Sequence, residues 1–299
     1  MAAPRSAFAN RTVPGQAPGR ADADIVTARV VEREMISLHL VRITIQAEEF
    51  RSETLVGPDQ YFGLFMPKPG TNYVPPRPYT GGNIRRHCDY LSEEERPDLR
   101  WYTVRHLDRD AGTVCFDVAT HGVNETGLMD ATNKQIGPGL RWVLTTRPGD
   151  TVGYFPSGAL WQSEPMPQVL VADSSSAPSV WSILDFQRAF RPEALSETHL
   201  ILAEVTGDPV EPLLVERAEA ELASVVVHRD RRENLPGRVS QLMRRRRPRR
   251  YPGSRAGYVW ACGERDLARA ARDAAVEDWG LPHENVLWSP YWIAGQPRP

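Results

Sequence analysis

The stretch Arg100-Trp101-Tyr102-Thr103-Val104-Arg105 decides the fold of the first half of this chain. On a strand, residues two apart share a face, so Arg100 and Tyr102 are expected to point the same way, with Thr103 on the other face or at a bend. A guanidinium can bind a diphosphate through paired hydrogen bonds, a tyrosine can lie against a flat ring, and a threonine hydroxyl can bond a ring heteroatom. Together these groups predict a flavin nucleotide site. The alternative is a half-buried strand with an exposed arginine.

A hairpin and several glycine turns follow this strand. A polar turn from Leu107 to Gly112 leads into a strand in which Val114, Phe116 and Val118 alternate with polar residues, ending at His121-Gly122. Next come Gly137-Pro138-Gly139-Leu140-Arg141-Trp142 and the turn Pro148-Gly149-Asp150. In this order the motifs resemble the FAD-binding half of the siderophore-interacting proteins, a branch of the ferredoxin-reductase-like flavoenzymes.

The resemblance implies an FAD site on named residues. Arg100 would bind the diphosphate, Tyr102 would pack on the flavin ring, and Thr103 would bond near its reactive nitrogen. The other implied cofactor contacts are Val118, His121, Gly122, Gly137, Gly139 and Trp142. A second Arg-x-Tyr-Thr copy, Arg77-Pro78-Tyr79-Thr80, is disfavoured because its proline lacks a ladder donor and Gly81-Gly82 ends any strand at once.

Composition limits the classes of function. The chain has 299 residues, enough for two domains, and 41% are apolar. A net charge of −2 and a pI near 6.4 give no reason to expect a nucleic-acid or membrane partner. Three scattered cysteines without a CxxC pair indicate a reducing compartment, so we expect a cytoplasmic protein. Residues 1–23 are expected to be a disordered tail, and the basic run Arg244 to Arg250 a solvated loop.

The first half reads as short strands separated by turns. The expected strands are Val26 to Glu32, Ile36 to Gln46, Tyr61 to Met66, Arg141 to Thr145 and Thr151 to Phe155, besides the two of the hairpin. A long loop over 68–99 and a polar insertion over 123–136 interrupt them. The pattern predicts an antiparallel Greek-key β-barrel, the FAD-binding domain, over residues 24–164.

After a linker at Ser163 to Pro167 the pattern changes to alternating strands and helices. The expected strands are 168–172, 199–205, 224–228, 257–262 and 285–288, and the expected helices 177–190, 210–222, 239–247 and 266–279. This predicts an α/β domain over 168–299, with a parallel sheet covered by helices on both faces. The whole chain is thus expected to be a two-domain α+β protein.

Polar residues at the strand ends of this second half mark where a nucleotide would bind. The family resemblance extends over Asp173 to Ser179, His228-Arg229, Val259 to Glu264 and Tyr291-Trp292 with Gly295. It implies that Asp173 and Ser175 bind NAD(P)H, since hydroxyls and amides at a helix start can meet a phosphate. The alternative is that these residues simply cap the helix.

The resemblance implies an FAD-dependent oxidoreductase that reduces ferric-siderophore iron to release Fe(II), with NAD(P)H or ferredoxin as donor. The flavin supplies the chemistry, so no catalytic side chain is expected. Arg105 is the first candidate contact for an anionic ferric siderophore. Leu140, Pro290 and Ile293 depart from the family pattern. They leave two alternatives open: a flavin oxidoreductase acting on another acceptor in a biosynthetic pathway, and a non-catalytic binding module that keeps the fold.

Overall fold

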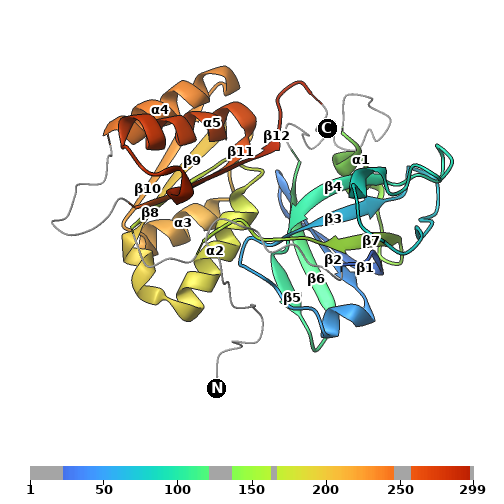
Figure 1. The fold of residues 1–299 in the computed structure, drawn as a ribbon. Coiled ribbons are helices and arrows are strands. Elements are labelled where there is room, and N and C mark those ends of the chain that lie inside the picture. Colours follow the sequence, from blue (N-terminus) through green and yellow to red (C-terminus); the bar gives the residue numbers. More distant parts are fainter. Residues whose placement is uncertain (1–22, 121–136, 163–166, 246–256, 297–299) are drawn as a thin grey trace. The chain divides into compact units, whose positions relative to one another are not determined.

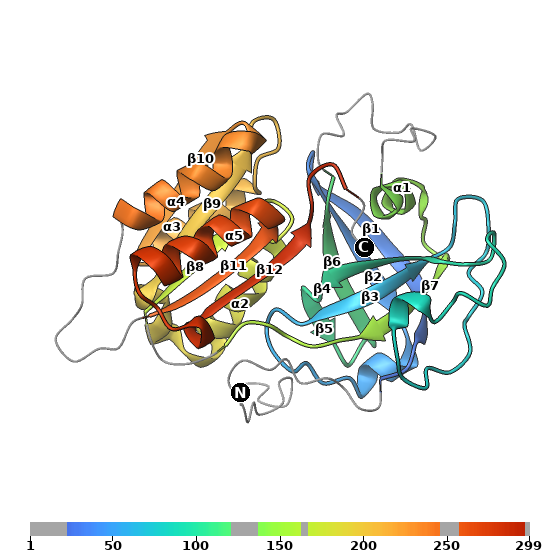
Figure 2. The ribbon, with the colours of Figure 1, turned by 45° about the horizontal axis from the view of Figure 1, so that its top comes forward.

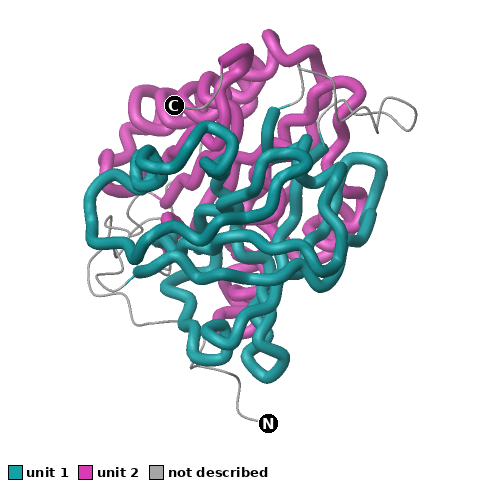
Figure 3. Tube along the Cα trace, turned by 90° about the vertical axis from the view of Figure 1, so that its right-hand side faces the viewer, with its two compact units in different colours: residues 1–11, 17–159 teal, residues 12–16, 160–299 magenta. Residues whose placement is uncertain are grey.

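The computed structural model describes residues 23–120, 137–162, 167–245 and 257–296. Its chain forms two compact units, the first ending at Ala159 and the second continuing from Leu160 (Figure 3). Each unit has its own sheet and its own apolar core. His121, Gly122, the insertion 123–136 and most of the expected tail and basic run lie outside the described residues.

Unit 1 is built on a seven-stranded antiparallel sheet in the order β4-β3-β7-β1-β2-β6-β5 (Figure 1). The strands are β1 (Val26–Ser37), β2 (Leu40–Gln46), β3 (Tyr61–Met66), β4 (Asp98–Thr103), β5 (His106–Asp108), β6 (Thr113–Ala119) and β7 (Thr151–Pro156). The side chains on one face of the sheet, among them Phe62, Leu64 and Phe116, are fully buried in a single core.

The two edges of this sheet come together. β4 and β5 stand at opposite ends of the strand order, yet only Val104 and Arg105 separate them in the chain. The amide of Val104 donates to Gln60 O at 2.8 Å, and the amide of Arg105 donates to Cys115 O on β6 at 2.9 Å. The sheet must therefore curl round on itself, which gives the barrel that the sequence predicted.

The long loop over 68–99 is packed against the outside of the barrel. Phe65 of β3 and Phe155 of β7 form a second buried cluster with Tyr73 and Cys88 of the loop. A Cβ at Gly153 would lie 2.1 Å from the Tyr73 hydroxyl, so this glycine lets the loop approach β7 closely. The loop contains one 3₁₀ turn, η3 (Ile84–Arg86).

The segment Arg141 to Thr145, expected as a strand, is instead the end of helix α1 (Pro138–Thr145), so that prediction is wrong. Proline at the first helical position has its φ preset for a helix and lacks an N–H that would have no partner there anyway. Gly139, Trp142 and Val143 are the buried residues of the helix, at the spacing of one helical face. The short apolar run Trp142-Val143-Leu144 cannot by itself distinguish a strand from a helix.

Unit 2 is a five-stranded parallel sheet in the order β10-β9-β8-β11-β12. Its strands are β8 (Gln168–Ala172), β9 (Thr198–Val205), β10 (Ser224–Asp230), β11 (Tyr258–Glu264) and β12 (Val286–Trp292). Helices α2 (Ala177–Phe190) and α3 (Pro212–Glu221) cover one face, and α4 (Leu235–Arg245) and α5 (Arg265–Asp273) cover the other (Figures 1 and 2). The predicted fold class is confirmed, and β8 and α2 have the bounds expected from the sequence.

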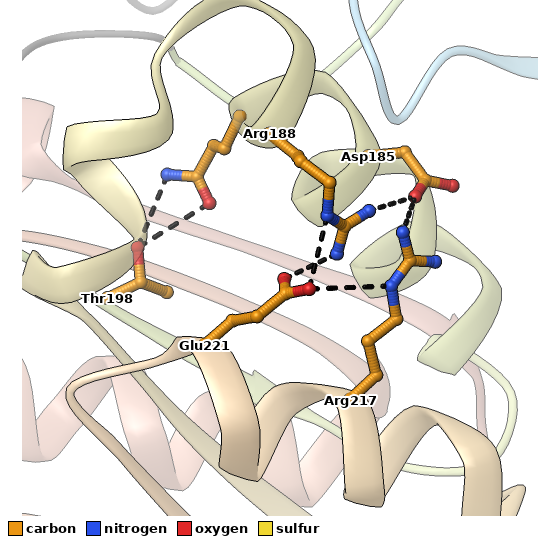
Figure 4. A network of polar contacts seen from close by, with 6 residues as sticks. Asp185, Arg188, Thr198, Arg217 and Glu221 are labelled. Atoms are coloured by element: carbon orange, nitrogen blue, oxygen red, sulfur yellow. Dashed lines mark hydrogen bonds and ion pairs between the residues drawn. The ribbon is translucent and has the colours of Figure 1, made fainter.

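An ion-pair network joins α2 to α3 on their outer surface (Figure 4). Arg188 of α2 is paired with Asp185 and with Glu221, and Arg217 of α3 reaches Asp185 at 3.1 Å. The Arg217 guanidinium also lies 5.0 Å from the centre of the Trp181 ring. All four charged side chains are about one-third exposed or slightly less. We therefore assign the network a structural role, holding two helices in register on one face of the sheet.

Candidate functional site

Arg100 and Tyr102 lie on the same face of β4, as the sequence predicted, and both meet the start of α1. A Cβ at Gly139 would lie 2.3 Å from the Tyr102 hydroxyl and 3.4 Å from Arg100 Cγ. Their neighbours Leu99 and Trp101 lie against Gly63 on the opposite face, where a Cβ at position 63 would come within 2.9 Å of Leu99 and 3.3 Å of Trp101. Because Gly139 has no side chain, the first turn of α1 can pack directly against Arg100 and Tyr102, the two side chains predicted to bind the flavin nucleotide.

Among the described residues, no side chain caps the N-terminus of α1. Its N-cap residue is Gly137, which makes no side-chain capping bond, and Pro138 follows. The first amides of a helix have no partner within the helix and carry the positive end of its dipole. Beside them stands Arg100, whose guanidinium donates to the Leu99 carbonyl at 2.7 Å and is partly exposed. Donors and charge that converge in this way fit a diphosphate.

A further cation, Arg85 of the loop turn η3, was missed by the sequence reasoning. Burial lowers the pKa of the Arg85 guanidinium, and the like charge of Arg100 lowers it further. Arg85 lies fifteen residues before Arg100, in a long loop whose path the sequence does not predict, so no local pattern could have revealed this proximity. Two guanidinium groups whose positive charges repel each other are suited to a ligand with more than one negative charge.

Tyr102 is half-buried and packs at the edge of the barrel core. Its ring centre lies 5.2 Å from that of Phe116 and 6.4 Å from that of Phe62. Burial raises the pKa of the Tyr102 phenol to about 12, while Arg100 acts in the opposite direction. The phenol is therefore neutral at any physiological pH and serves as a flat surface and a hydrogen-bonding group. Thr103 is 6% exposed and lies on the opposite face of the strand.

Two of the expected cofactor contacts, Val118 and Trp142, are buried in the barrel core. Val118 and Trp142 are 4% and 5% exposed and belong to the barrel core. The Trp142 ring lies nearly parallel to that of Phe116, at 6.5 Å between centres. Leu140 also packs against this core. These side chains help to hold β6 and α1 in place. Contact of Val118 and Trp142 with FAD stays a prediction.

The competing copy at Arg77 is engaged within its own loop. The Arg77 guanidinium lies 4.4 Å from the centre of the Tyr90 ring, and the Arg77 amide donates to the Tyr90 hydroxyl at 2.6 Å. The Tyr79 hydroxyl donates to the Gly82 carbonyl at 2.6 Å, and its ring packs on Phe155. These contacts of Arg77 and Tyr79 stabilise the loop.

Arg105 lies at the corner between β4 and β5, close to the thiol of Cys115. Burial raises the pKa of the Cys115 thiol to about 11, opposed by the charges of Arg42 and Arg105. Arg42 is paired with the buried Asp117 carboxylate through two hydrogen bonds of 2.7 and 2.9 Å. The thiol therefore stays protonated and is not a nucleophile at neutral pH. Contact of Arg105 with an acceptor remains a prediction.

In unit 2, the carboxyl end of β8 is organised by one buried carboxylate. Asp173 is 5% exposed. Its Oδ1 accepts from the amides of Ser175 and Ser176 at 2.9 and 3.2 Å and from the Ser175 hydroxyl at 2.5 Å. Its Oδ2 accepts from the Glu264 amide at 2.7 Å and from Trp292 Nε1 at 3.0 Å. The amides of Ser175 and Ser176 and the Ser175 hydroxyl, which the sequence suggested as phosphate ligands, thus donate to the Asp173 carboxylate.

The carboxyl end of β11 is closed in a similar way. Gly263 has a φ of +138°, and a Cβ there would lie 2.7 Å from the Asp173 carboxylate, so only glycine fits. Glu264 caps α5 by accepting from the amides of Asp266 and Leu267, and its other oxygen accepts from the Ala294 amide at 3.2 Å. Glu264 is thus the N-cap of α5, and these bonds join β8, β11 and the segment after β12.

Two findings limit other kinds of site. Among the described residues, no three His, Cys, Asp or Glu side chains gather in a group that could hold a metal ion. Within the same part of the chain, no helix combines the length and the apolar character that crossing a membrane requires.

Two family models match the chain, one for each half. Residues 29–159 match the siderophore-interacting FAD-binding domain, and residues 166–295 match the siderophore-interacting protein model. A curated relative, the mycobactin import ATP-binding/permease protein IrtA of Mycolicibacterium thermoresistibile, is 22% identical over 277 residues. The match covers 90% of this chain and 25% of that protein, so the chain spans about a quarter of the length of this relative.

Solved structures share the fold over nearly the whole chain. The siderophore-interacting protein SipS from Aeromonas hydrophila has a TM-score of 0.66 at 20% identity, covering 92% of this chain and 94% of its own. A siderophore utilization protein from T. fusca has a TM-score of 0.64 at 20% identity, covering 94% and 98%. The FAD/NAD-binding domain of a nitric oxide dioxygenase from Vibrio cholerae has a TM-score of 0.60 at 13% identity, covering 90% and 99%.

Proposed function

Since the chain belongs to the siderophore-interacting protein family, we propose that it is an FAD-dependent oxidoreductase that reduces the iron of a ferric siderophore. The observation that carries the proposal is the meeting of Arg100 and Tyr102 with the first turn of α1 at Gly139. A diphosphate and a flat ring, joined as in a flavin nucleotide, match this combination of donors, positive charge and aromatic surface.

Each residue of this site has a defined task. Arg100 and the first amides of α1 bind the diphosphate, and Arg85 adds charge from the loop. Tyr102 presents its neutral ring to the flavin, and Gly139 keeps the helix close enough for both groups to act together. FAD, when bound, supplies the redox chemistry by accepting electrons from a donor and passing them on. The barrel core beneath, with Phe116 and Trp142, fixes these groups in place.

The acceptor is a ferric chelate with oxygen-rich, anionic character. Hard oxygen ligands hold Fe(III) more tightly than Fe(II), so one-electron reduction loosens the complex and releases the metal. Arg105, at the β4–β5 corner that follows the flavin-binding strand, is the proposed contact for the anionic ligand. One relative is a mycobactin import protein, which supports a siderophore as the acceptor class.

The test is electron transfer from the reduced flavin to chelated iron. The full chain, loaded with FAD, is reduced chemically without oxygen and mixed in a stopped-flow instrument with a ferric siderophore in the presence of an Fe(II) trap. We expect reoxidation of the flavin together with the appearance of trapped Fe(II). Arg105→Gln should slow this step at low salt more than at high salt, because exposed charges are screened beyond about 8 Å at physiological ionic strength.

Two outcomes would replace this proposal by an alternative. Reduced protein that transfers no electrons to any ferric siderophore tried, yet is reoxidised by another acceptor, would indicate a flavin oxidoreductase of a different pathway. Protein that never takes up FAD would indicate a non-catalytic module that keeps the fold.

A further inference from the structure

The loop over 68–99 contains four arginines, of which one takes no part in the contacts of the loop itself. The other three are each engaged within the loop by an aromatic ring or a carboxylate: Arg77 by Tyr90, and Arg86 and Arg96 by Asp89. Arg85 is exposed and has no carboxylate partner among the described residues. The internal contacts of the loop therefore do not account for this positive charge.

The packing of the loop brings Arg85 close to Arg100. The Arg85 amide donates to Asn83 Oδ1 at 3.0 Å, which fixes the turn η3. Ile84 of this turn and Leu99 of β4 both pack against the buried cluster on the outside of the barrel, and each directly precedes one of the two arginines. Partial burial lowers the pKa of the Arg85 guanidinium and the like charge of Arg100 lowers it further, so the two charges interact.

The Arg100 guanidinium is likewise without a carboxylate partner in the part of the chain that the structure describes. It donates to the Leu99 carbonyl at 2.7 Å, and its side chain lies beside the first turn of α1, where a Cβ at Gly139 would be 3.4 Å from Arg100 Cγ. Two like charges held near each other raise the free energy of the site, and an anion that bridges them removes this cost. The pair of arginines thus suits a ligand with two adjacent phosphates, one for each guanidinium.

We propose that Arg85 binds the second phosphate of FAD, the one that carries the adenosine, while Arg100 and the first amides of α1 bind the phosphate on the flavin side. The loop over 68–99 thereby selects FAD over FMN. This inference rests on the proposed function and deepens it, because it assigns the choice between two flavin cofactors to a side chain outside the Arg-x-Tyr-Thr strand. FMN ends in a single phosphate, so it can engage Arg100 and α1 but gives Arg85 no phosphate of its own.

The experiment is a titration of the flavin-free full chain with FAD and, in a second arm, with FMN, each followed by flavin fluorescence. We expect Arg85→Gln to weaken FAD binding by about tenfold or more, the effect of one lost charge-assisted hydrogen bond, and to leave FMN binding within about twofold of the wild type. Arg100→Ala should weaken the binding of both flavins, because both place a phosphate at Arg100. Equal losses for FAD and FMN in Arg85→Gln, or no loss for FAD, would overturn the proposal.

The matched control is Arg86→Gln, at the next position of the same turn. The Arg86 side chain is 80% exposed and is paired with Asp89 at 3.5 Å. Its replacement removes the same charge from the loop without removing the proposed contact, so the variant should bind FAD and FMN as the wild type does. Equal losses of FAD affinity in Arg85→Gln and Arg86→Gln would show that the general positive charge of the turn is what matters, and would overturn the proposal.

Limited digestion with trypsin, which cleaves after arginine, gives a second readout that does not depend on activity. The bonds after Arg85 and Arg86 lie in an exposed turn, where proteases cut readily. Saturating FAD should slow cleavage there in the wild-type chain and saturating FMN should not; equal protection by both flavins would overturn the proposal. If Arg85→Gln binds FAD as the wild type does while the reduced flavin still passes electrons to a ferric siderophore, this inference fails and the proposed function stands. A wild-type chain that takes up neither flavin would contradict both.

Discussion

The hydroxyl of Tyr102 stands where a side chain on Gly139 would have to begin, since a Cβ at position 139 would come within 2.3 Å of it. Real Cβ contacts do not reach such a distance, so the first turn of α1 and the tyrosine of β4 are fitted to each other. This fit brings backbone amides, a guanidinium and an aromatic ring together in one unit of the chain.

The fit predicts that Gly139→Ala weakens FAD binding. The added methyl group pushes α1 away from Arg100 and Tyr102, so the diphosphate can no longer reach both sets of donors. Overpacking of this kind costs roughly 1–3 kcal/mol, which lowers affinity about tenfold or more. The measurement is titration of flavin-free protein with FAD, followed by flavin fluorescence.

Two further variants control this prediction. Gly137→Ala adds a methyl group at a position where no atom of the described residues lies within 4 Å, so it should change FAD affinity little. Tyr102→Phe in the Gly139→Ala background removes the atom that clashes and should restore part of the lost affinity. Equal losses in Gly137→Ala and Gly139→Ala would show that the close approach of α1 is not what matters.

A second prediction concerns the Asp173 carboxylate. Asp173→Asn replaces one acceptor oxygen by a donor, which then faces amide and indole N–H groups that have lost their partner. An unsatisfied buried donor costs about 1–3 kcal/mol. We therefore expect Asp173→Asn to lower the free energy of unfolding by about that amount, measured by urea denaturation. Asp266→Asn, a partly exposed control in α5, should cost much less; similar values for both would contradict the role of Asp173.

A third prediction follows from the raised pKa of Tyr102. The phenol of the unfolded chain ionises near its ordinary pKa of 10.0, whereas burial holds the pKa in the folded protein at about 12. Above pH 10 the unfolded state therefore releases a proton that the folded state retains, and stability falls as the pH rises from 10 to 12. Each pKa unit corresponds to about 1.4 kcal/mol, so the fall attributable to Tyr102 is at most roughly 2–3 kcal/mol.

Comparison with Tyr102→Phe isolates this contribution. The phenylalanine cannot ionise, so the stability of the variant should fall less steeply with pH above 10 than that of the wild type. Urea denaturation at a series of alkaline pH values measures the difference. Parallel curves for the two proteins across this range would show that the Tyr102 phenol is not protected by the fold.

Much of the fold followed from periodicity and turn residues alone. The alternation of Val114, Phe116 and Val118 predicted β6, and the unbroken apolar run Gln168 to Ala172 predicted β8 to the residue. Alternation along β4 also placed Arg100 and Tyr102 on one face, because strand geometry leaves no other choice. These are local properties, and sequence reasoning handles local properties well.

The wrong prediction of a strand over Arg141 to Thr145 came from a short apolar run that suits a strand or a helix equally well. Other features of the site could not be predicted because they depend on contacts between distant segments. Nothing local shows that Leu140 and Trp142 face the barrel core, or that Arg85 approaches Arg100 from a long loop. The sequence allowed the amides of Ser175 and Ser176 to bind either a phosphate or a side chain of the protein, and in the structure they donate to Asp173. The other partners of the Asp173 carboxylate, Glu264 and Trp292, lie about a hundred residues away in the chain. Such contacts depend on which strands become neighbours, which the sequence pattern leaves open.

The central claim, that the diphosphate of FAD binds at Arg100 beside the N-terminus of α1, is tested most directly by comparing the two Arg-x-Tyr-Thr copies. Flavin-free wild type, Arg100→Ala and Arg77→Ala are titrated with FAD under the same conditions. Losing a charge-assisted, bidentate contact costs about 1.5–3 kcal/mol, so Arg100→Ala should bind FAD roughly tenfold to more than a hundredfold more weakly. Arg77→Ala should remain close to the wild type, because Arg77 packs on Tyr90 within its loop. Equal losses of affinity in the two variants, or none in Arg100→Ala, would contradict the account.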